Sequence, residues 1–222
     1  MDHIFYLLFS IGYIGLLLWG LKGLGNHAVL KWTTVIYLVV LALVYDNAVL
    51  AIGNWIGEGE LLKTMNLLRY WLHAFMTPLL VLYSVGTLRE SGMEWAKKKP
   101  ITLIAILYTL AAIVVEISLG LTNLQLHVRQ EYDVLSYVPA ESNGPPIMIL
   151  LVTAAMLIAS AILWKMTGWA AFFFGVVIMT IGSAIPFPVE SNAITNLFEL
   201  VLLTSLMWTK RKLNLGRIHV GR

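Results

Sequence analysis

Long apolar runs, separated by short polar stretches, repeat along the whole chain. Each run approaches or exceeds the roughly 20 residues that an α-helix needs to cross the hydrocarbon core of a bilayer. Such runs are typical of membrane-spanning helices rather than of the apolar stripe of a soluble helix. The pattern predicts an all-α, polytopic membrane protein in which residues 1–222 form one domain of seven transmembrane helices. The predicted spans are Ile4–Gly20, Val29–Asn54, Leu61–Leu88, Ile101–Leu121, Pro146–Trp164, Trp169–Phe187 and Ala193–Trp208.

Two features modify this simple bundle. Pro78 lies inside the third span, and its missing N–H predicts a kink in that helix. The stretch 122–145, between the fourth and fifth spans, is polar and long enough to fold over one mouth of the bundle.

Composition supports insertion into a membrane. Hydrophobic residues make up 59% of the chain and charged residues only 12%, and the mean hydropathy is +0.81. A soluble domain carries about 25% charged residues, so this chain has too few to cover the surface of a soluble fold. The absence of cysteine excludes disulfides, thiolate metal sites and cysteine nucleophiles.

The distribution of lysine and arginine predicts the orientation. Basic residues are enriched in cytoplasmic loops, and here they gather at one side of the predicted bundle. This places the N-terminus outside and the C-terminus in the cytoplasm of a cell membrane. It also explains the net charge of +3 without a nucleic-acid partner. Lys63 and Arg129 fall on the outer side and Arg69 inside a span, whereas the cytoplasmic set is Lys22, Lys31, Arg89, Lys97, Lys98, Lys99, Lys165, Lys210, Arg211, Lys212, Arg217 and Arg222.

Ionisable residues within the spans are few, and such residues usually face the bundle interior, a cavity or a partner. At about 1.5 Å of rise per residue, Asp46, Arg69 and Glu199 come ~10–12 Å below the outer mouth, and His73 comes ~18 Å below it. The sequence therefore predicts one polar pocket that opens toward the outer side. Its catalytic candidates are Asp46, His73 and Glu199, and its substrate-binding candidates are Arg69, Asn47, Asn66, Tyr70, Asn196, Tyr45 and Glu116.

Two interpretations of these charges stay open. In the structural one, Arg69 pairs with Asp46 or Glu199 and joins helices, while asparagines form further interhelical hydrogen bonds. In the functional one, a single arginine leaves at least one carboxyl without a cationic partner, and that acid exchanges protons with a substrate beside His73. Metal binding by Asp46, Glu199 and His73 is geometrically possible, but we predict neither a metal site nor a cofactor.

The third predicted helix resembles that of the microbial rhodopsins. The match consists of Arg69-Tyr70 followed by Thr77-Pro78-Leu79-Leu80, about a dozen residues in all. The resemblance implies a seven-helix fold with a buried pocket. It does not imply light-driven pumping, because Leu72 replaces the counterion carboxylate of the pumps and His73 replaces a tryptophan. No lysine lies in the middle of the last span, where that family binds retinal.

Two classes of function compete. The chain is similar in size and character to the small polytopic terpene cyclases, although it shares no motif with them. The convergence of surplus acids with a histidine favours a membrane-embedded enzyme that uses buried acids on an amphiphilic lipid or isoprenoid, and the similarity to these cyclases is an analogy. The alternative is a rhodopsin-fold receptor, binding protein or transporter without covalent retinal. In both cases the expected partners are membrane lipids and a hydrophobic or amphiphilic small molecule.

Overall fold

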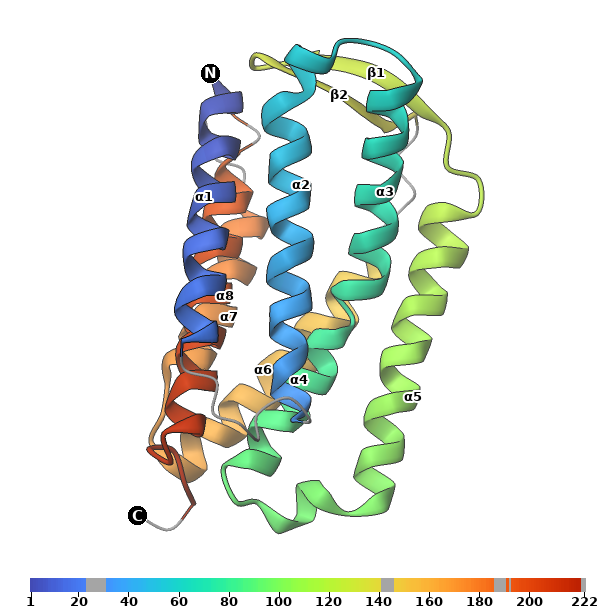
Figure 1. Ribbon diagram of the computed structural model, residues 1–222. Coiled ribbons are helices and arrows are strands. Elements are labelled where there is room, and N and C mark those ends of the chain that lie inside the picture. Colours follow the sequence, from blue (N-terminus) through green and yellow to red (C-terminus); the bar gives the residue numbers. More distant parts are fainter. Residues whose placement is uncertain (23–30, 141–145, 186–190, 192, 221–222) are drawn as a thin grey trace.

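The structure is a computed structural model that describes residues 1–22, 31–140, 146–185, 191 and 193–220. The predicted span limits Val29 and Phe187 lie outside these residues. Most of the chain is helical, and the helices run side by side as a bundle (Figure 1). The elements are α1 (Asp2–Leu21), η2 (Trp32–Val35), α2 (Ile36–Ile56), α3 (Glu60–Met76), α4 (Leu79–Glu90), η3 (Glu94–Lys97), α5 (Lys99–Glu116), η4 (Ile117–Leu121), β1 (Leu126–Glu131), β2 (Val134–Pro139), α6 (Ile147–Thr167), α7 (Ala171–Ala184) and α8 (Ile194–Asn214).

Several helices have the length and apolar character of membrane spans. By these criteria the described residues contain five candidates: Asp2–Leu21, Trp32–Ile56, Glu60–Glu90, Lys99–Leu121 and Ile147–Thr167. Helix α7 is apolar but shorter, with 14 residues. Helix α8 has 21 residues, but Glu199 and its basic final turns make it more polar. The prediction of a helical membrane protein is thus supported, whereas seven crossings remain a prediction.

The third predicted span is broken at Pro78, as expected. Helix α3 ends at Met76, and α4 begins at Leu79 and continues in a shifted direction (Figure 1). Proline has no N–H to donate to the carbonyl one turn earlier, and its ring crowds that carbonyl, so the helix bends there.

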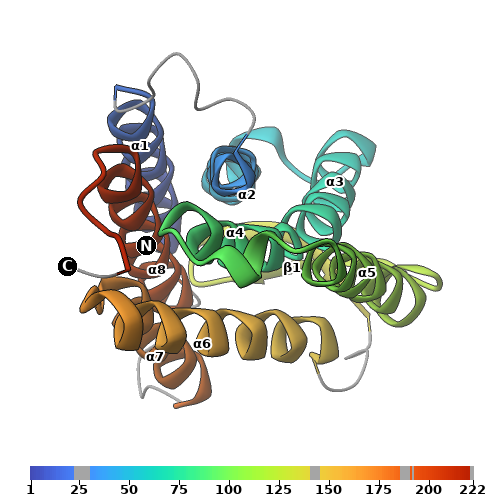
Figure 2. The same ribbon diagram turned by 90° about the horizontal axis from the view of Figure 1, so that it is seen from below.

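Helices α1, α2 and α8 pack along one another, and α7 packs along α8. Helix α4 lies near the centre of the bundle, in contact with α2, α5, α6 and α8 (Figure 2). Helix α6 crosses the others obliquely. Helix α3 packs on α2, α4, α5 and β2. Among the described residues it has no extended packing with α6, α7 or α8. This arrangement leaves space inside the bundle between α3 and those three helices.

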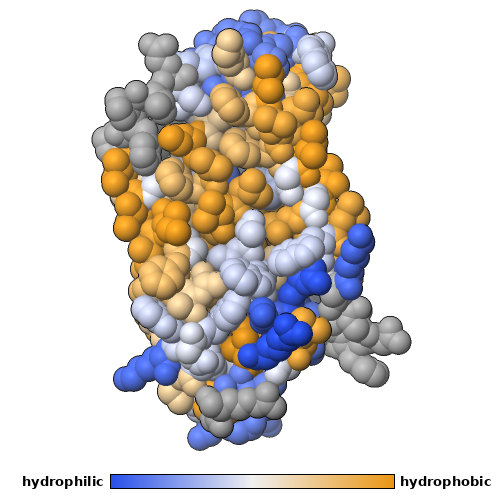
Figure 3. Space-filling view, turned by 90° about the vertical axis from the view of Figure 1, so that its left-hand side faces the viewer, coloured by the Kyte–Doolittle hydropathy of each residue, from blue (hydrophilic) through white to orange (hydrophobic). Residues whose placement is uncertain are grey.

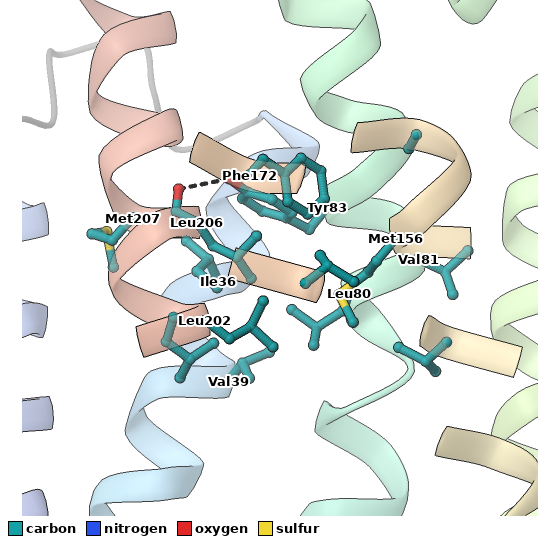
Figure 4. Close-up of a cluster of buried hydrophobic side chains, with 14 of the residues drawn as sticks. Ile36, Val39, Leu80, Val81, Tyr83, Met156, Phe172, Leu202, Leu206 and Met207 are labelled. Atoms are coloured by element: carbon teal, nitrogen blue, oxygen red, sulfur yellow. Dashed lines mark hydrogen bonds between the residues drawn. The ribbon is translucent and has the colours of Figure 1, made fainter. Parts of the chain in front are cut away.

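The main core surrounds α4. Apolar side chains from α2, α4, α6, α7 and α8 meet there (Figure 4). The Tyr83 hydroxyl donates a 2.6 Å hydrogen bond to the carbonyl of Leu206, and the Phe172 ring packs edge-on against Tyr83 with 5.7 Å between ring centroids. At Gly182 the ring of Phe198 lies where a Cβ would be, so α7 approaches α8 closely.

The outside of the bundle is apolar between two hydrophilic ends. On the face that Figure 3 shows, hydrophobic residues form a broad belt, with hydrophilic residues gathered above and below it. The exposed apolar residues of α1 include Ile4, Leu8, Ile11 and Leu18. Lipid tails are as apolar as these side chains, so this surface fits a bilayer and not water.

The all-α expectation is incomplete, because residues 126–139 form an antiparallel hairpin. Tyr132 and Asp133 form its two-residue turn, both with positive φ. The hairpin covers the end of the bundle that holds the start of α1, the end of α2 and the start of α3, which we call the hairpin end (Figure 1). The described part of the stretch 122–145 thus folds over one end of the bundle, for which its length is sufficient.

Hydrogen bonds join the hairpin to three helices. The backbone N–H of Asp2 donates to the Tyr132 carbonyl at 3.0 Å, which connects the hairpin to α1. The Asn54 side chain of α2 donates to the Asp133 carbonyl at 2.7 Å. The Tyr70 hydroxyl of α3 donates to the Tyr137 carbonyl at 3.3 Å.

Candidate functional site

A cavity of about 370 Å³ occupies the space between α3 and the group α6, α7 and α8. Its wall is mostly apolar, with polar side chains at a few positions only. Ligand cavities of proteins typically have this character and begin at about this size. The wall consists of Val39, Ala42, Leu43, Asp46, Arg69, Leu72, His73, Met76, Thr77, Leu80, Pro146, Ile149, Leu150, Val152, Thr153, Met156, Met179, Thr180, Ser183, Ala184, Glu199, Leu202 and Leu203.

An ion pair between α2 and α3 forms part of the cavity wall. The Arg69 Nε donates to Asp46 Oδ1 at 2.8 Å, and the Arg69 Nη1 donates to Asn66 Oδ1 at 2.8 Å. Asn66 is itself fixed, because its Nδ2 donates to the Leu62 carbonyl at 2.8 Å. The side chains are 12% exposed for Arg69 and 24% for Asp46, so the pair is largely withdrawn from solvent. The sequence left open whether Asp46 or Glu199 pairs with Arg69, and the structure selects Asp46.

Glu199 reaches the same cavity from α8. It lies close enough to Asp46 and Arg69 for their charges to interact, but it makes no hydrogen bond or ion pair with another described residue. His73 also lines the cavity, and its Nδ1 is 3.2 Å from Thr77 Oγ1, one helical turn further on. The four residues predicted as the core of the pocket, Asp46, Arg69, His73 and Glu199, therefore share one cavity.

Asn47 and Asn196 hold α2 to α8 beside the cavity, and neither forms its wall. The Asn196 Nδ2 donates to Asn47 Oδ1 at 2.9 Å, and the Asn47 Nδ2 donates to the Leu43 carbonyl at 3.0 Å. The Tyr13 hydroxyl of α1 donates to the Asn196 carbonyl at 3.3 Å. These contacts keep α8, and with it Glu199, in register with α2.

The remaining predicted members also lie outside the cavity wall. Tyr45 donates from its hydroxyl to the Met65 carbonyl at 3.0 Å and so joins α2 to α3. Tyr70 bonds to the hairpin, as described above. Glu116, at the end of α5, lies against Gly120 and close enough to His73 for their charges to interact. Tyr45 and Tyr70 thus hold α3 in place from outside the cavity, and Asn66 holds Arg69.

Sequence reasoning missed two polar groups. Thr153 of α6 and the α7 residues Thr180 and Ser183 lie in the cavity wall, but an isolated hydroxyl in an apolar run is ordinary in a membrane helix and gives no signal. The second group lies away from the cavity, and we call it the Glu90 cluster: Glu90 with Thr33, Lys31 and Lys210.

The Glu90 cluster joins η2, α4 and α8 at the end of the bundle opposite the hairpin. Thr33 Oγ1 donates to Glu90 Oε1 at 2.5 Å, and Lys210 Nζ is 3.6 Å from Glu90 Oε2 and donates to Thr33. The Lys210 side chain is fully buried. From the sequence, Lys210 is expected only to indicate the orientation of the chain.

No group of three or more histidine, aspartate or glutamate side chains within the described ranges is arranged to hold a metal ion. No protein family, curated protein or solved structure matches the chain. The resemblance to the microbial rhodopsins therefore remains a prediction. The function has to be argued from the cavity itself.

Proposed function

We propose that the protein is a membrane-embedded enzyme that uses Glu199 as an acid on an amphiphilic lipid or isoprenoid. One observation carries this proposal: a mostly apolar cavity contains a carboxyl group that makes no hydrogen bond or ion pair with another described residue. An apolar wall accommodates a hydrocarbon tail, and a few polar groups orient the reacting end. A carboxyl group without a fixed partner is available to give and take a proton.

The neighbouring residues have distinct roles in this proposal. Arg69 already bonds to Asp46 and Asn66, so it holds Asp46 in the cavity wall and is not the acid. Glu199 gives its proton to a double bond or an oxygen atom of the substrate, and its carboxylate regains a proton from the rearranged product. His73, held by Thr77, assists this return. The overall change is an isomerisation or cyclisation that needs no second substrate.

We infer further that the chain crosses the membrane seven times, with the hairpin end outside. Helices α7 and α8 supply the two crossings beyond the five candidate spans. In support, α8 is as long as α6, with 21 residues each. Helix α1 begins at the hairpin end and α8 finishes at the opposite end (Figure 1), as an odd number of crossings requires.

A carrier is less well supported than an enzyme. Transport requires a polar path from the cavity to the opposite end, and the Glu90 cluster and the apolar core around Tyr83 occupy that half of the bundle. No lysine lies in the described cavity wall, so covalent retinal has no attachment point there. A binding protein or receptor with this cavity would take up the same class of molecule without converting it.

The proposal is tested by turnover. The full-length protein, purified in mild detergent, is incubated with a total lipid extract from its source membrane, and the lipids are compared by untargeted mass spectrometry. We expect the wild type to deplete a specific lipid or isoprenoid and to form a product of identical mass and different retention. Glu199→Gln should abolish this conversion.

The matched control is Glu60→Gln, because the Glu60 side chain lies at the hairpin end and is 87% exposed. It should convert the substrate as the wild type does. A specific lipid that co-purifies with the wild type and is never converted would favour the binding-protein alternative. Conversion that survives Glu199→Gln in a folded protein would refute the assigned acid.

A further inference from the structure

The cavity wall contains more acidic than cationic side chains. Two carboxyl groups, Asp46 and Glu199, face one guanidinium, Arg69. The guanidinium already uses two of its five N–H donors on described residues, because its Nε bonds to Asp46 and its Nη1 bonds to Asn66. Recognition of a phosphate or carboxylate by arginine typically uses two parallel N–H donors. An anion bound at Arg69 would therefore share the guanidinium with Asp46.

The other elements around the cavity add no positive charge to the described wall. Helix α6 contributes Thr153 as its polar side chain, and α7 contributes Thr180 and Ser183. His73 of α3 bonds to Thr77, and no lysine is present in the described wall. The nearest buried lysine that the structure describes, Lys210, belongs to the Glu90 cluster and bonds to Thr33.

This arrangement favours a positive charge and disfavours a negative one. Charges interact more strongly in an apolar wall than in water, because the surroundings screen them less. A cationic group beside Glu199 pairs with its carboxylate once Glu199 has given up its proton. An anionic group would have to lie beside Glu199 and compete with Asp46 for Arg69.

The apolar part of the cavity is suited to one hydrocarbon chain. Its wall extends along α6 from Pro146 to Met156 and along α2 from Val39 to Asp46. At the start of α6, Ile149 is 43% exposed and Leu150 is 59% exposed, although both line the cavity. The cavity thus adjoins the lipid-facing surface there, and a chain from the bilayer reaches it without crossing water.

We propose that the cavity selects single-chain amphiphiles whose polar end carries a positive charge, either in the bound molecule or as it reacts. The inference rests on the proposed function only in placing the ligand in this cavity. For the enzyme it specifies the substrate class: an uncharged isoprenoid or lipid that becomes cationic when Glu199 protonates it, and not a diphosphate or a fatty acid. A stable amine then resembles the reacting state and binds more tightly than the corresponding alcohol.

Equilibrium binding of three probes with the same tail tests the charge. Radiolabelled dodecylamine, dodecanol and dodecyl phosphate are titrated into the full-length protein in phosphatidylcholine nanodiscs, and binding to empty nanodiscs is subtracted. We expect dodecylamine to bind about tenfold or more tightly than dodecanol. Dodecyl phosphate should show no saturable binding. In Glu199→Gln the advantage of the amine over the alcohol should disappear, whereas Glu60→Gln should retain it.

Four results would overturn the inference: equal affinity for amine and alcohol, tightest binding of the phosphate, no saturable binding of any probe, or an amine preference unchanged in Glu199→Gln. The ranking on the unmodified protein decides the sign of the charge even where Glu199→Gln does not fold. Binding and turnover fail independently. Selective amine binding without lipid conversion would refute the proposed enzyme and support the charge selectivity. Lipid conversion without the expected ranking of the probes would support the enzyme and refute the charge selectivity.

Discussion

At Gly53 the backbone of α2 approaches the backbone of β2 so closely that a side chain has no room. A Cβ at this position would overlap the carbonyl oxygen of Leu135. Glycine normally weakens a helix, by about 1 kcal/mol relative to alanine. Its position near the end of α2 is explained by the hairpin, which bonds to the adjacent Asn54.

We expect Gly53→Ala to displace the hairpin and to lower the free energy of unfolding by about 1–3 kcal/mol, the usual range for overpacking. Thermal unfolding in detergent measures the stability, and hydrogen exchange over residues 126–139 reports the displacement. Gly15→Ala is the control, because a Cβ at Gly15 in α1 meets no atom within 4 Å. If both variants behaved alike, the close approach at Gly53 would not matter.

Arg69 allows structural and functional charges to be separated. Removing it in Arg69→Ala leaves Asp46 without its ion-pair partner, and breaking such a pair typically costs about 3–5 kcal/mol when it is buried. Because both side chains here are partly exposed, we expect Arg69→Ala to lower the free energy of unfolding by an amount toward the lower end of this range. The double variant Asp46→Asn/Arg69→Gln, which leaves no lone charge in the pair, should recover much of the stability. Denaturant titration of the three proteins provides the comparison, and a double variant as unstable as Arg69→Ala would contradict it.

The Glu90 cluster connects three elements, η2, α4 and α8, through one carboxylate. Its partners come from distant parts of the chain, since Lys210 follows Glu90 by 120 residues. Lys210 is fully buried and Glu90 is 12% exposed, so neither charge is well solvated alone. Removing one partner should therefore cost more than removing both.

We expect Glu90→Gln to lower the stability by about 3 kcal/mol, and Glu90→Gln/Lys210→Met to be less destabilised than Glu90→Gln alone. Neither variant touches the cavity wall, so saturable dodecylamine binding should persist in whatever protein remains folded. Thermal unfolding combined with that binding assay checks both parts. Loss of binding in a fully folded Glu90→Gln protein would show that the cluster controls the cavity.

The helices could be predicted from the sequence because the length of an apolar run is enough to identify them. The break at Pro78 could be predicted because proline interrupts the hydrogen bonds of any helix interior. The hairpin was missed because Tyr132-Asp133 is not one of the usual two-residue turn sequences, and its strands are short. The four cavity charges were found because ionisable residues are rare in spans. The pairing of Arg69 with Asp46, the Thr153 and Thr180 hydroxyls and the Glu90 cluster depend on how distant helices meet, which a single sequence does not specify.

At the scale of the whole molecule, the two ends of the bundle differ in charge. The end opposite the hairpin carries the Lys97, Lys98 and Lys99 run and the basic last turn of α8, whereas Lys63 and Arg129 are the basic residues of the hairpin end among those the structure describes. From this difference the positive-inside rule predicts that the hairpin end lies outside.

The absence of native cysteine makes this orientation directly measurable. A membrane-impermeant maleimide should label Glu58→Cys in intact cells, because residue 58 is exposed at the hairpin end. It should label Lys98→Cys only after the cells are permeabilised. The opposite pattern would reverse the orientation, and labelling of both positions in intact cells would show that an even number of spans separates them.

The hairpin is also made much later than the helices it covers. Leu135 follows Gly53 by 82 residues, so at a synthesis rate of about 5–20 residues per second it emerges ~4–16 s after its partner. During that interval α1, α2 and α3 lack their cover. The bonds already available include one between α2 and α1, from Tyr37 to the Gly20 carbonyl, and two between α2 and α3, the ion pair of Asp46 with Arg69 and the bond from Tyr45 to Met65. The Asp46–Arg69 pair of the mature cavity thus joins α2 to α3 before the hairpin has been made, whereas Glu199 on α8 is added only after it.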